Sequence, residues 1–334
     1  MLLYSLSLKL LHIQLYATLI IVGIFPLFFY KIIIKPLNIL LYAMKEVSKG
    51  NSKVTIPATT DEISLATQTL NQVKNDLENY ISEKSKTETI MEIAKNIQTS
   101  LLPSDLDVFG YEIVAYSKPA DDVGGDYYDI IDEKGKKYAV IGDVCGHGLA
   151  AGLIMIMAQT LIHSCLQSGI TDLTEILIRV NQTLLSNIER LQEDKYMTLT
   201  LFRFEENGKI IHSGAHQDIL VYRNRTKKVE AIKTYGCWLG ILDDISDLVR
   251  NNELLLEGDD MMLLFTDGII EAIDENQNRY EKNRLIKLLE ENGEFQPEFV
   301  KQKIIESLND YTIEDDITLM VFKKMSILKE TRSM

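Results

Sequence analysis

The sequence predicts an α+β fold for residues 103–325, in which helices pack on the outside of antiparallel sheets. Two observations predict it. Short runs rich in branched and aromatic residues follow one another after Pro103, and the helical segments among them are clustered instead of alternating with the strands. A third observation, an uncharged apolar run followed by heptad spacing, predicts a transmembrane helix and a coiled coil ahead of this domain.

The apolar run begins the chain after a short segment, residues 1–9. Between Lys9 and Lys31 there is no Asp, Glu, Lys or Arg, and about twenty such residues suffice to cross a bilayer. We therefore predict a single transmembrane helix at residues 10–34. Lysines are more frequent after this segment than before it, which favours a single-pass protein of the inner (cytoplasmic) membrane with everything after the helix in the cytoplasm.

Two stretches with coiled-coil spacing follow the apolar run. The first contains Leu37, Leu40, Met44 and Val47, and a polar connector ending at Pro57 separates it from the second, in which the seam positions are Ile63, Ala66, Leu70, Val73 and Leu77. A plain membrane stalk has the same spacing. The run KPLNILLYAMKEVSKGN and the later DEISLATQTLNQVKNDL also resemble a HAMP signalling module, which we place at residues 35–83, with a coiled-coil linker helix at 84–102. Because such helices cannot bury their apolar stripes alone, a homodimer is expected.

The predicted domain at 103–325, followed by a tail at 326–334, contains eight expected strands and three expected helices. The strands are 111–117, 127–131, 138–141, 197–204, 210–213, 219–222, 261–265 and 317–322, and the helices are about 149–167, 173–191 and 283–292. The formal net charge of the whole chain is −14, which argues against a nucleic-acid partner, because phosphate backbones are bound by clustered Lys and Arg.

Acidic residues adjoin four of the expected strands: Asp126, Asp143, Asp267 and the pair Asp315–Asp316. Taken singly, each is consistent with ordinary turn chemistry. Taken together, they lack basic partners in their own segments, and carboxylates that cluster without cations repel unless a hard divalent ion holds them. Oxygen ligands of this kind favour Mg²⁺ or Mn²⁺.

The segment GDVCGHG, from Gly142 to Gly148, joins an expected strand to an expected helix. Its glycines let the backbone turn tightly, which offers Asp143 at the strand end. Cys145 could be a nucleophile, because a turn before a helix lowers a thiol pKa. The three cysteines form no C-x-x-C pair, so reduced thiols are the simpler interpretation.

Five segments resemble one family in order: AKNIQTSLLP, YSKPADDVGGDYYDII, VIGDVCGHGLAAGLIM, GDDMMLLFTDGIIEA and EDDITLMVF. They look like the RsbU and sporulation stage II protein E type serine phosphatases of the metal-dependent, protein phosphatase 2C-like superfamily. The resemblance implies a four-layer α-β-β-α sandwich of two antiparallel sheets flanked by helices, two divalent ions (Mn²⁺ or Mg²⁺), and hydrolysis of a protein phosphoserine or phosphothreonine by a metal-activated water.

The resemblance also implies roles for individual residues. The metal ligands would be Asp126, Asp143, the backbone carbonyl of Val144, Asp267 and Asp315, with Asp143 bridging the ions. Asp316, Asp122 and His216 would support them from outside. His147 stands where the family commonly has Lys, and it is our candidate for the general acid that protonates the leaving oxygen. No covalent intermediate is implied, which argues against a nucleophilic Cys145.

Two hypotheses about function follow. The first is a membrane-anchored phosphatase in bacterial signalling, whose implied partner is a STAS-type anti-sigma-factor antagonist phosphoprotein. The alternative is a catalytically inactive phosphatase fold that recognises a phosphorylated partner. The presence of all four matched acids favours catalysis.

Overall fold

The computed structural model describes residues 9–10, 12–16, 18, 25–35, 38, 41–42, 45, 62–103 and 105–326. The chain divides into two compact units, Met1–Thr89 and Ile90–Met334. Residues 11, 17 and 19–24 of the predicted transmembrane helix, most of residues 36–61 of the HAMP-like module, and the tail beyond residue 326 fall outside the described residues. Of this N-terminal region the structure shows helix α2 (Phe25–Phe29), the π-helical η2 (Tyr30–Ile34) and α4 (Glu62–Leu101).

Helix α4 is continuous for 40 residues and ends at Leu101, two residues before Pro103. A proline restricts the residue before it to extended backbone, so the helix stops where the sequence predicts. Its last turns belong to the second unit, Ile90–Met334, which also contains both sheets.

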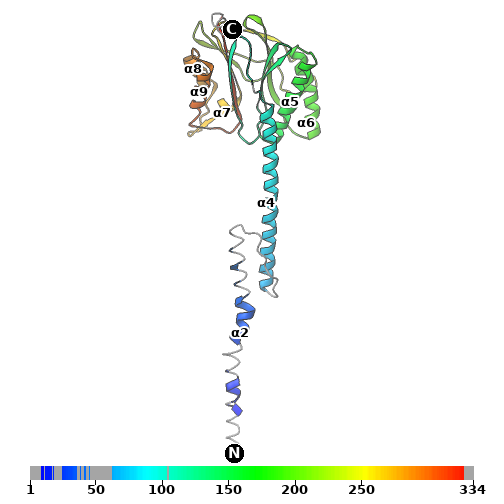
Figure 1. The fold of residues 1–334 in the computed structure, drawn as a ribbon, viewed down its shortest axis with the longest axis vertical. Helices are drawn as coiled ribbons and strands as arrows, with labels where there is room; N and C mark the ends of the chain where they lie inside the picture. Colours follow the sequence, from blue (N-terminus) through cyan, green and yellow to red (C-terminus); the bar gives the residue numbers. More distant parts are fainter. Residues whose placement is uncertain are drawn as a thin grey trace, which may run out of the picture. The chain divides into compact units, whose positions relative to one another are not determined.

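Two five-stranded antiparallel sheets form the body of the second unit (Figure 1). The first sheet has the strand order β1 (Tyr111–Lys118), β12 (Ile317–Lys324), β9 (Met261–Phe265), β6 (Ile219–Arg223) and β7 (Lys228–Ile232). The second has the order β2 (Tyr127–Glu133), β3 (Lys136–Val144), β4 (Met197–Phe204), β5 (Lys209–Ala215) and β8 (Asn252–Leu255). A two-residue pair, β10 (Ile273–Asp274) with β11 (Tyr311–Thr312), and the 3₁₀ turn η3 (Glu206–Gly208) complete the minor elements.

Helices cover the outer face of each sheet (Figure 1). Helices α5 (Leu149–Gln167) and α6 (Leu173–Leu191) pack on the second sheet, whereas α8 (Lys282–Asn292) and α9 (Pro297–Ser307) pack on the first, near the short α7 (Asp267–Glu271). The result is the predicted four-layer α-β-β-α sandwich, and the α+β fold class is confirmed.

Successive side chains along a strand contribute to two different hydrophobic cores. In β12, Leu319 and Val321 contribute to the core under α8 and α9, while Met320 and Phe322 contribute to the core between the sheets. Successive strand residues point to opposite faces, so a strand buried on both faces reads as one apolar run. This explains why the sequence of β12 shows no polar alternation.

Within the described residues, α5 is the one helix that is long and apolar enough to cross a membrane. It carries no Asp, Glu, Lys or Arg, and its residues Ala151, Ile154, Met155, Ala158 and Ile162 lie fully buried against the second sheet and α6. Its apolar character is accounted for by this place in the core.

Candidate active site

The acids singled out in the sequence meet at one edge of the sandwich. The start of β2 pairs with the end of β3, Tyr127 opposite Gly142, and the start of β12 lies beside the end of β9, Leu319 opposite Phe265. Antiparallel pairing thus brings together residues before β2 and β12 and residues at the ends of β3 and β9. These are the five carboxylates: Asp126, Asp143, Asp267, Asp315 and Asp316.

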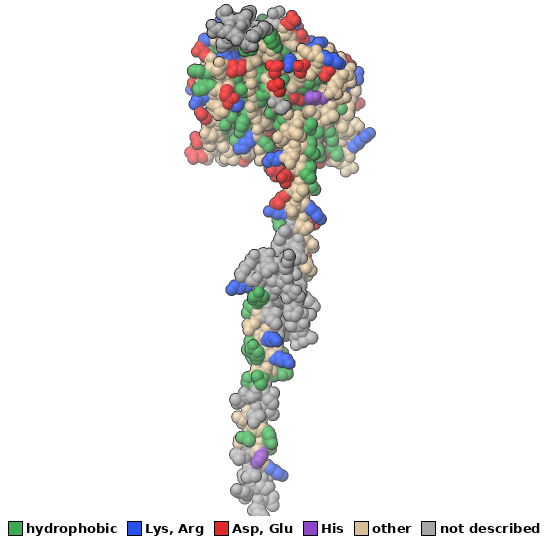
Figure 2. All heavy atoms as spheres, viewed as in Figure 1, with side chains coloured by type: hydrophobic (Ala, Val, Ile, Leu, Met, Phe, Trp, Pro, Cys, Tyr) green, Lys and Arg blue, Asp and Glu red, His purple; other side chains and the backbone are tan. Residues whose placement is uncertain are grey.

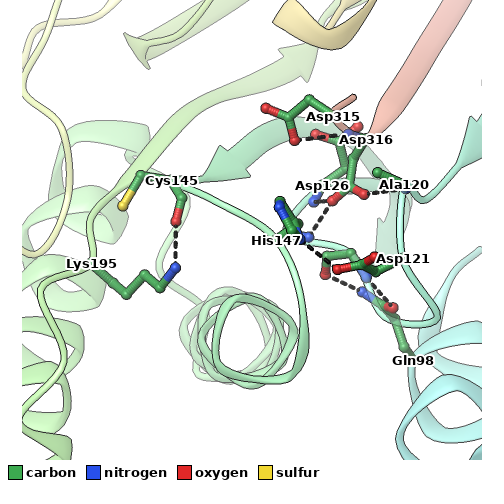
Figure 3. A network of polar contacts seen from close by, with 11 residues as sticks. Gln98, Ala120, Asp121, Asp126, Cys145, His147, Lys195, Asp315 and Asp316 are labelled. Carbon is green, nitrogen blue, oxygen red and sulfur yellow. Dashed lines mark hydrogen bonds and ion pairs between the residues drawn. The ribbon is translucent and has the colours of Figure 1, made fainter. Parts of the chain in front are cut away.

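Asp316 organises the loop that carries Asp126 (Figure 3). Its side chain is buried, and each of its oxygens accepts a backbone hydrogen bond: Oδ1 from Ala120 N at 2.7 Å and Oδ2 from Gly125 N at 2.5 Å. Burial raises the pKa of Asp316, while these amide donors act in the opposite direction by stabilising the carboxylate. Its oxygens are therefore committed to the loop backbone.

Gly125 is required by the packing of this loop against β3. A Cβ atom at position 125 would lie 2.7 Å from the carbonyl oxygen of Val144, closer than side-chain carbons approach. The two segments are also joined by a hydrogen bond from Val144 N to Gly125 O at 3.3 Å. The second glycine of VGGD therefore lets the Asp126 loop lie directly beside the end of β3.

Asp126 itself is only 7% exposed, and one of its oxygens has no partner. Oδ2 accepts a hydrogen bond from Thr266 Oγ1 at 2.8 Å, whereas Oδ1 is buried without a hydrogen-bond partner among the described residues. Burial, and then the charge of Asp316, raise the pKa of Asp126 well above its ordinary value. A buried carboxylate oxygen left unsatisfied is costly, so this atom is available to a ligand.

The charges of all the other acids in the cluster act on Asp143. Burial raises its pKa from 3.8 to about 9, and the charges of the other four acids act in the same direction, Asp126 most strongly. Burial, followed by Asp315, also raises the pKa of Asp267. The five carboxylates therefore repel one another, and ionising all of them without a cation is unfavourable.

The donor set fits hard divalent cations. The carboxylates of Asp126, Asp143, Asp267 and Asp315 and the carbonyl of Val144 offer only oxygen, which Mg²⁺ and Mn²⁺ prefer, and a cation would relieve the repulsion and satisfy Asp126 Oδ1. In the described part of the chain, however, no three His, Cys, Asp or Glu side chains converge as a ready set of ligands. Side-chain rotation is therefore needed to close the set around an ion.

Helix α4 reaches this loop through Gln98, a residue that the sequence analysis did not single out. Gln98 Nε2 donates to Gly124 O at 2.7 Å, and Gly124 N donates to Gln98 Oε1 at 3.1 Å (Figure 3). A cavity of about 180 Å³, lined by Gln98, Tyr128 and Asp126 among others, lies beside this contact. The signal was present: position 98 is the heptad position between Ala94 and Leu101, and a buried amide there replaces the expected apolar residue.

The predicted general acid lies at the rim of the site. His147 Nδ1 is 2.5 Å from Asp121 Oδ2, and both side chains are about half exposed. Asp122, predicted to support the metals, is exposed, and its nearest cation is Lys95 of α4 at 3.7 Å. Asp122 also lines the cavity beside Asp126 but forms no part of the five-carboxylate cluster.

His216 joins the two sheets next to the acids. Its Nε2 donates to the carbonyl of Phe265, at the end of β9, at 3.1 Å, and its Nδ1 lies 2.8 Å from Thr198 Oγ1 of β4. Burial lowers the pKa of His216 to about 4, so the ring is neutral near pH 7. A neutral ring with Nε2 as donor accepts the Thr198 hydroxyl at Nδ1, which makes His216 a structural link between β4 and β9.

The turn after Asp143 is held from the segment that precedes β4. Cys145 N donates to Tyr196 O at 2.9 Å, and Lys195 Nζ donates to Cys145 O at 2.9 Å (Figure 3). Cys145 Sγ accepts a hydrogen bond from Tyr196 N at 3.3 Å. The cysteine is thereby fixed within the turn, and Lys195, which lies outside the sequence motifs, is a cation that contacts this turn.

Solved structures share this fold. The SiaA-PP2C domain of Pseudomonas aeruginosa is 22% identical, with a TM-score of 0.62, and the match covers 72% of this chain and 98% of that one. The RsbU and RsbW domains of Rv1364c from Mycobacterium tuberculosis are 21% identical, with a TM-score of 0.55, over 65% of this chain and 60% of that one. The fold is therefore that of the PP2C class.

Sequence relatives place the chain within that class. It is 29% identical over 252 residues to the phosphoserine phosphatase RsbU of Bacillus subtilis, and the aligned region covers 73% of this chain and 72% of RsbU. It is 24% identical over 294 residues to the protein IcfG of Synechocystis, of which it covers 46%. The sequence model of Stage II sporulation protein E (SpoIIE) matches residues 133–324, and the chain belongs to this family of PP2C-type serine phosphatases.

Proposed function

We propose that the chain is a membrane-anchored, metal-dependent protein serine/threonine phosphatase that removes phosphate from a STAS-type anti-sigma-factor antagonist in a partner-switching pathway. The observation that carries the metal-dependent chemistry is the edge of five carboxylates, in which burial and mutual repulsion raise the pKa of Asp143 to about 9. Such an edge cannot attract a phosphate dianion unless cations first neutralise it.

In this proposal Asp126, Asp143, the Val144 carbonyl, Asp267 and Asp315 hold two divalent ions, Mn²⁺ or Mg²⁺. The chemistry that the ions supply when bound is a water activated for attack on phosphorus and neutralisation of the phosphate oxygens. Asp316 and Gly125 position Asp126 beside β3, and Thr266 fixes its Oδ2.

His147 has the role of proton donor to the leaving serine oxygen. Its contact with Asp121 at Nδ1 leaves Nε2 as the nitrogen able to donate to substrate. Asp121 is thereby proposed to orient the ring, as the third group does in many acid–base arrangements.

The substrate and the membrane location rest on different observations. The STAS-type partner is proposed from family membership and from the likeness to RsbU, a phosphoserine phosphatase. The anchor is proposed from the uncharged run at residues 10–34 and the lysines that follow it, and the homodimer from the heptad spacing of the stalk. Asp and Glu side chains are spread among Lys and Arg on the face shown in Figure 2, consistent with a protein partner and not a nucleic acid.

The test of catalysis is hydrolysis of p-nitrophenyl phosphate by the full-length chain in detergent, with Mn²⁺ and with EDTA. Wild type is compared with Asp143→Asn and with Asp243→Asn, a matched change at an exposed acid outside the cluster. Activity that needs Mn²⁺ and Asp143 but tolerates Asp243→Asn is expected. A folded wild-type protein inactive with Mn²⁺ and with Mg²⁺ would instead support a binding module.

The substrate is tested with serine-phosphorylated STAS-domain proteins, beside phosphotyrosine and phosphohistidine proteins of similar size. Release of phosphate from the phosphoserine form alone is expected. For the anchor, the full chain and a variant lacking residues 10–34 are compared by membrane fractionation, and recovery of both in the soluble fraction would disprove it.

A further inference from the structure

Lys195 is placed beside the turn that follows Asp143 by the pairing of two central strands. In the β3–β4 register, Asp143 is opposite Thr198 and Val144 is opposite Met197. The residues just before β4 therefore run beside the turn that follows Asp143. There the Lys195 ammonium donates to the carbonyl of Cys145, two residues beyond Asp143 (Figure 3).

The segment that carries Lys195 is well fixed. The neighbouring Tyr196 stacks on the ring of Trp238, with ring centroids 4.8 Å apart and planes 10° from parallel. The backbone of Met197 exchanges hydrogen bonds with Leu239 at 2.9 and 2.8 Å. A cation on such a support has a defined position, which a lysine on a mobile loop does not have.

Lys195 differs from the partly buried Lys137 and Lys282 in having no acidic partner. Lys137 forms ion pairs with Asp107 and Asp132, and Lys282 forms one with Asp218. For Lys195, no carboxylate lies within 4.0 Å of Nζ in the part of the chain that the structure describes, and the contact found there is the Cys145 carbonyl. An ammonium has three N–H donors, so two remain for another acceptor.

The segment lies within electrostatic range of the acids. The pKa of the adjacent Tyr196 is raised first by burial and then by the charges of Cys145, Asp143 and Asp267. Lys195 itself contacts the turn two residues beyond Asp143 and forms no ion pair with the acids of the described chain. An isolated cation at this place suits an anion that approaches the same edge.

We propose that Lys195 Nζ binds a non-bridging oxygen of the substrate's phosphate monoester while it retains its hydrogen bond to the Cys145 carbonyl. This inference rests on the proposed phosphatase function and adds a phosphate-binding residue to it. Lysine binds phosphate as a point charge, and charge-assisted hydrogen bonds of this kind are about twice as strong as neutral ones. Lys195 would supply a positive charge from the segment before β4.

The turn itself is shaped to accept the ammonium. A Cβ atom at Gly146 would lie 2.9 Å from Lys195 Nζ, so the glycine allows the ammonium to lie against the turn. The alternative is that Lys195 only braces the turn. A brace acts on the position of Asp143 and hence on metal binding and on the rate of the chemical step, whereas a phosphate ligand acts on the affinity for phosphate.

The experiment uses the full-length chain with Lys195→Gln, Lys195→Arg and, as a matched control, Lys209→Gln at a partly exposed lysine that starts β5 and pairs with Glu253. Three quantities are measured: kcat and KM for p-nitrophenyl phosphate with Mn²⁺, the inhibition constant of inorganic phosphate, and the Mn²⁺ affinity without substrate. We expect Lys195→Gln to raise KM and the phosphate inhibition constant about tenfold, the size of one lost charge-assisted contact. Its kcat and Mn²⁺ affinity should stay within about twofold of wild type.

Lys195→Arg keeps the charge and should recover most of the phosphate affinity, which also guards against a Gln variant that fails to fold. A Lys195→Gln protein with unchanged phosphate inhibition but lower kcat or weaker Mn²⁺ binding would overturn the proposal in favour of the brace. Failure of the phosphatase function itself is seen separately, as a wild type without metal-dependent turnover. In that case calorimetric binding of phosphate to the Mn²⁺-loaded proteins decides about Lys195, and equal affinity of wild type and Lys195→Gln would reject it.

Discussion

Replacing Asp143 by asparagine is expected to stabilise the metal-free protein while it abolishes activity. The carboxyl has a pKa of about 9 in the folded protein against 3.8 in the unfolded chain. The folded state therefore binds this proton more tightly, so its stability falls as the pH rises from 3.8 towards 9. A pH of 7 lies about 3.2 pH units above the unfolded pKa of 3.8. At about 1.4 kcal/mol per unit, the raised pKa of Asp143 lowers the free energy of unfolding of the metal-free protein by at most about 4 kcal/mol.

Asparagine removes this cost because it does not ionise, but its amide brings its own desolvation penalty of about 1–3 kcal/mol. The net stabilisation at pH 7 should then be about 1–3 kcal/mol, or roughly 3–8 °C in Tm for a domain of this size. The assay is thermal unfolding in EDTA from pH 5 to pH 9 for wild type, Asp143→Asn and Asp243→Asn.

The difference in Tm between Asp143→Asn and wild type should be near zero at pH 5 and should grow with pH. Adding Mn²⁺ should reverse the order, because only wild type retains the proposed bridging ligand. If Asp143→Asn unfolds at a lower temperature than wild type in EDTA at every pH, or by a margin that does not change with pH, the electrostatic reasoning about this edge is wrong.

Three further outcomes are expected. Gln98→Ala, which removes both hydrogen bonds to Gly124, should lower the free energy of unfolding by about 1–3 kcal/mol and reduce p-nitrophenyl phosphate turnover, whereas the exposed neighbour Thr99→Ala should change neither. Gly125→Ala should weaken Mn²⁺ binding, measured by calorimetry, because its Cβ would force the Asp126 loop away from β3; wild-type affinity in this variant would contradict that packing. His216→Gln should keep the shape of the wild-type pH–rate profile between pH 5.5 and 9, since burial lowers the pKa of His216 to about 4; loss of an acid limb near pH 6 would show that this ring titrates during catalysis.

The strands that the sequence predicts well are those in the middle of the sheets. The runs at 197–204 and 261–265 coincide with β4 and β9, because both strands are buried on two faces and read as apolar segments. In the two five-stranded sheets, the missed strands are the edge strands β7 and β8, whose sequences KVEAI and NELL are partly polar. Helix α9 was also missed, because its charged face conceals the apolar spacing of Val300 and Ile304.

The candidate site was predictable where a residue type and its neighbours in the sequence were enough. The acids could be found because each adjoins an apolar strand. The residues that were missed act across the fold: Gln98 contacts a residue 26 positions away, Lys195 one 50 positions away, and Thr266 one 140 positions away. Such contacts depend on strand register and helix placement, which no local pattern contains.

The apolar helix α5 has a consequence for how the protein is made. All that covers it, apart from β2 and β3, is synthesised after it: α6 follows directly, and β4 and β5 come later still. While the ribosome is still translating those segments, the nascent chain presents a stretch that matches a membrane span in length and composition. We therefore expect early docking of α6 onto α5 to keep α5 out of the bilayer, and chains truncated between α5 and α6 would lack this cover.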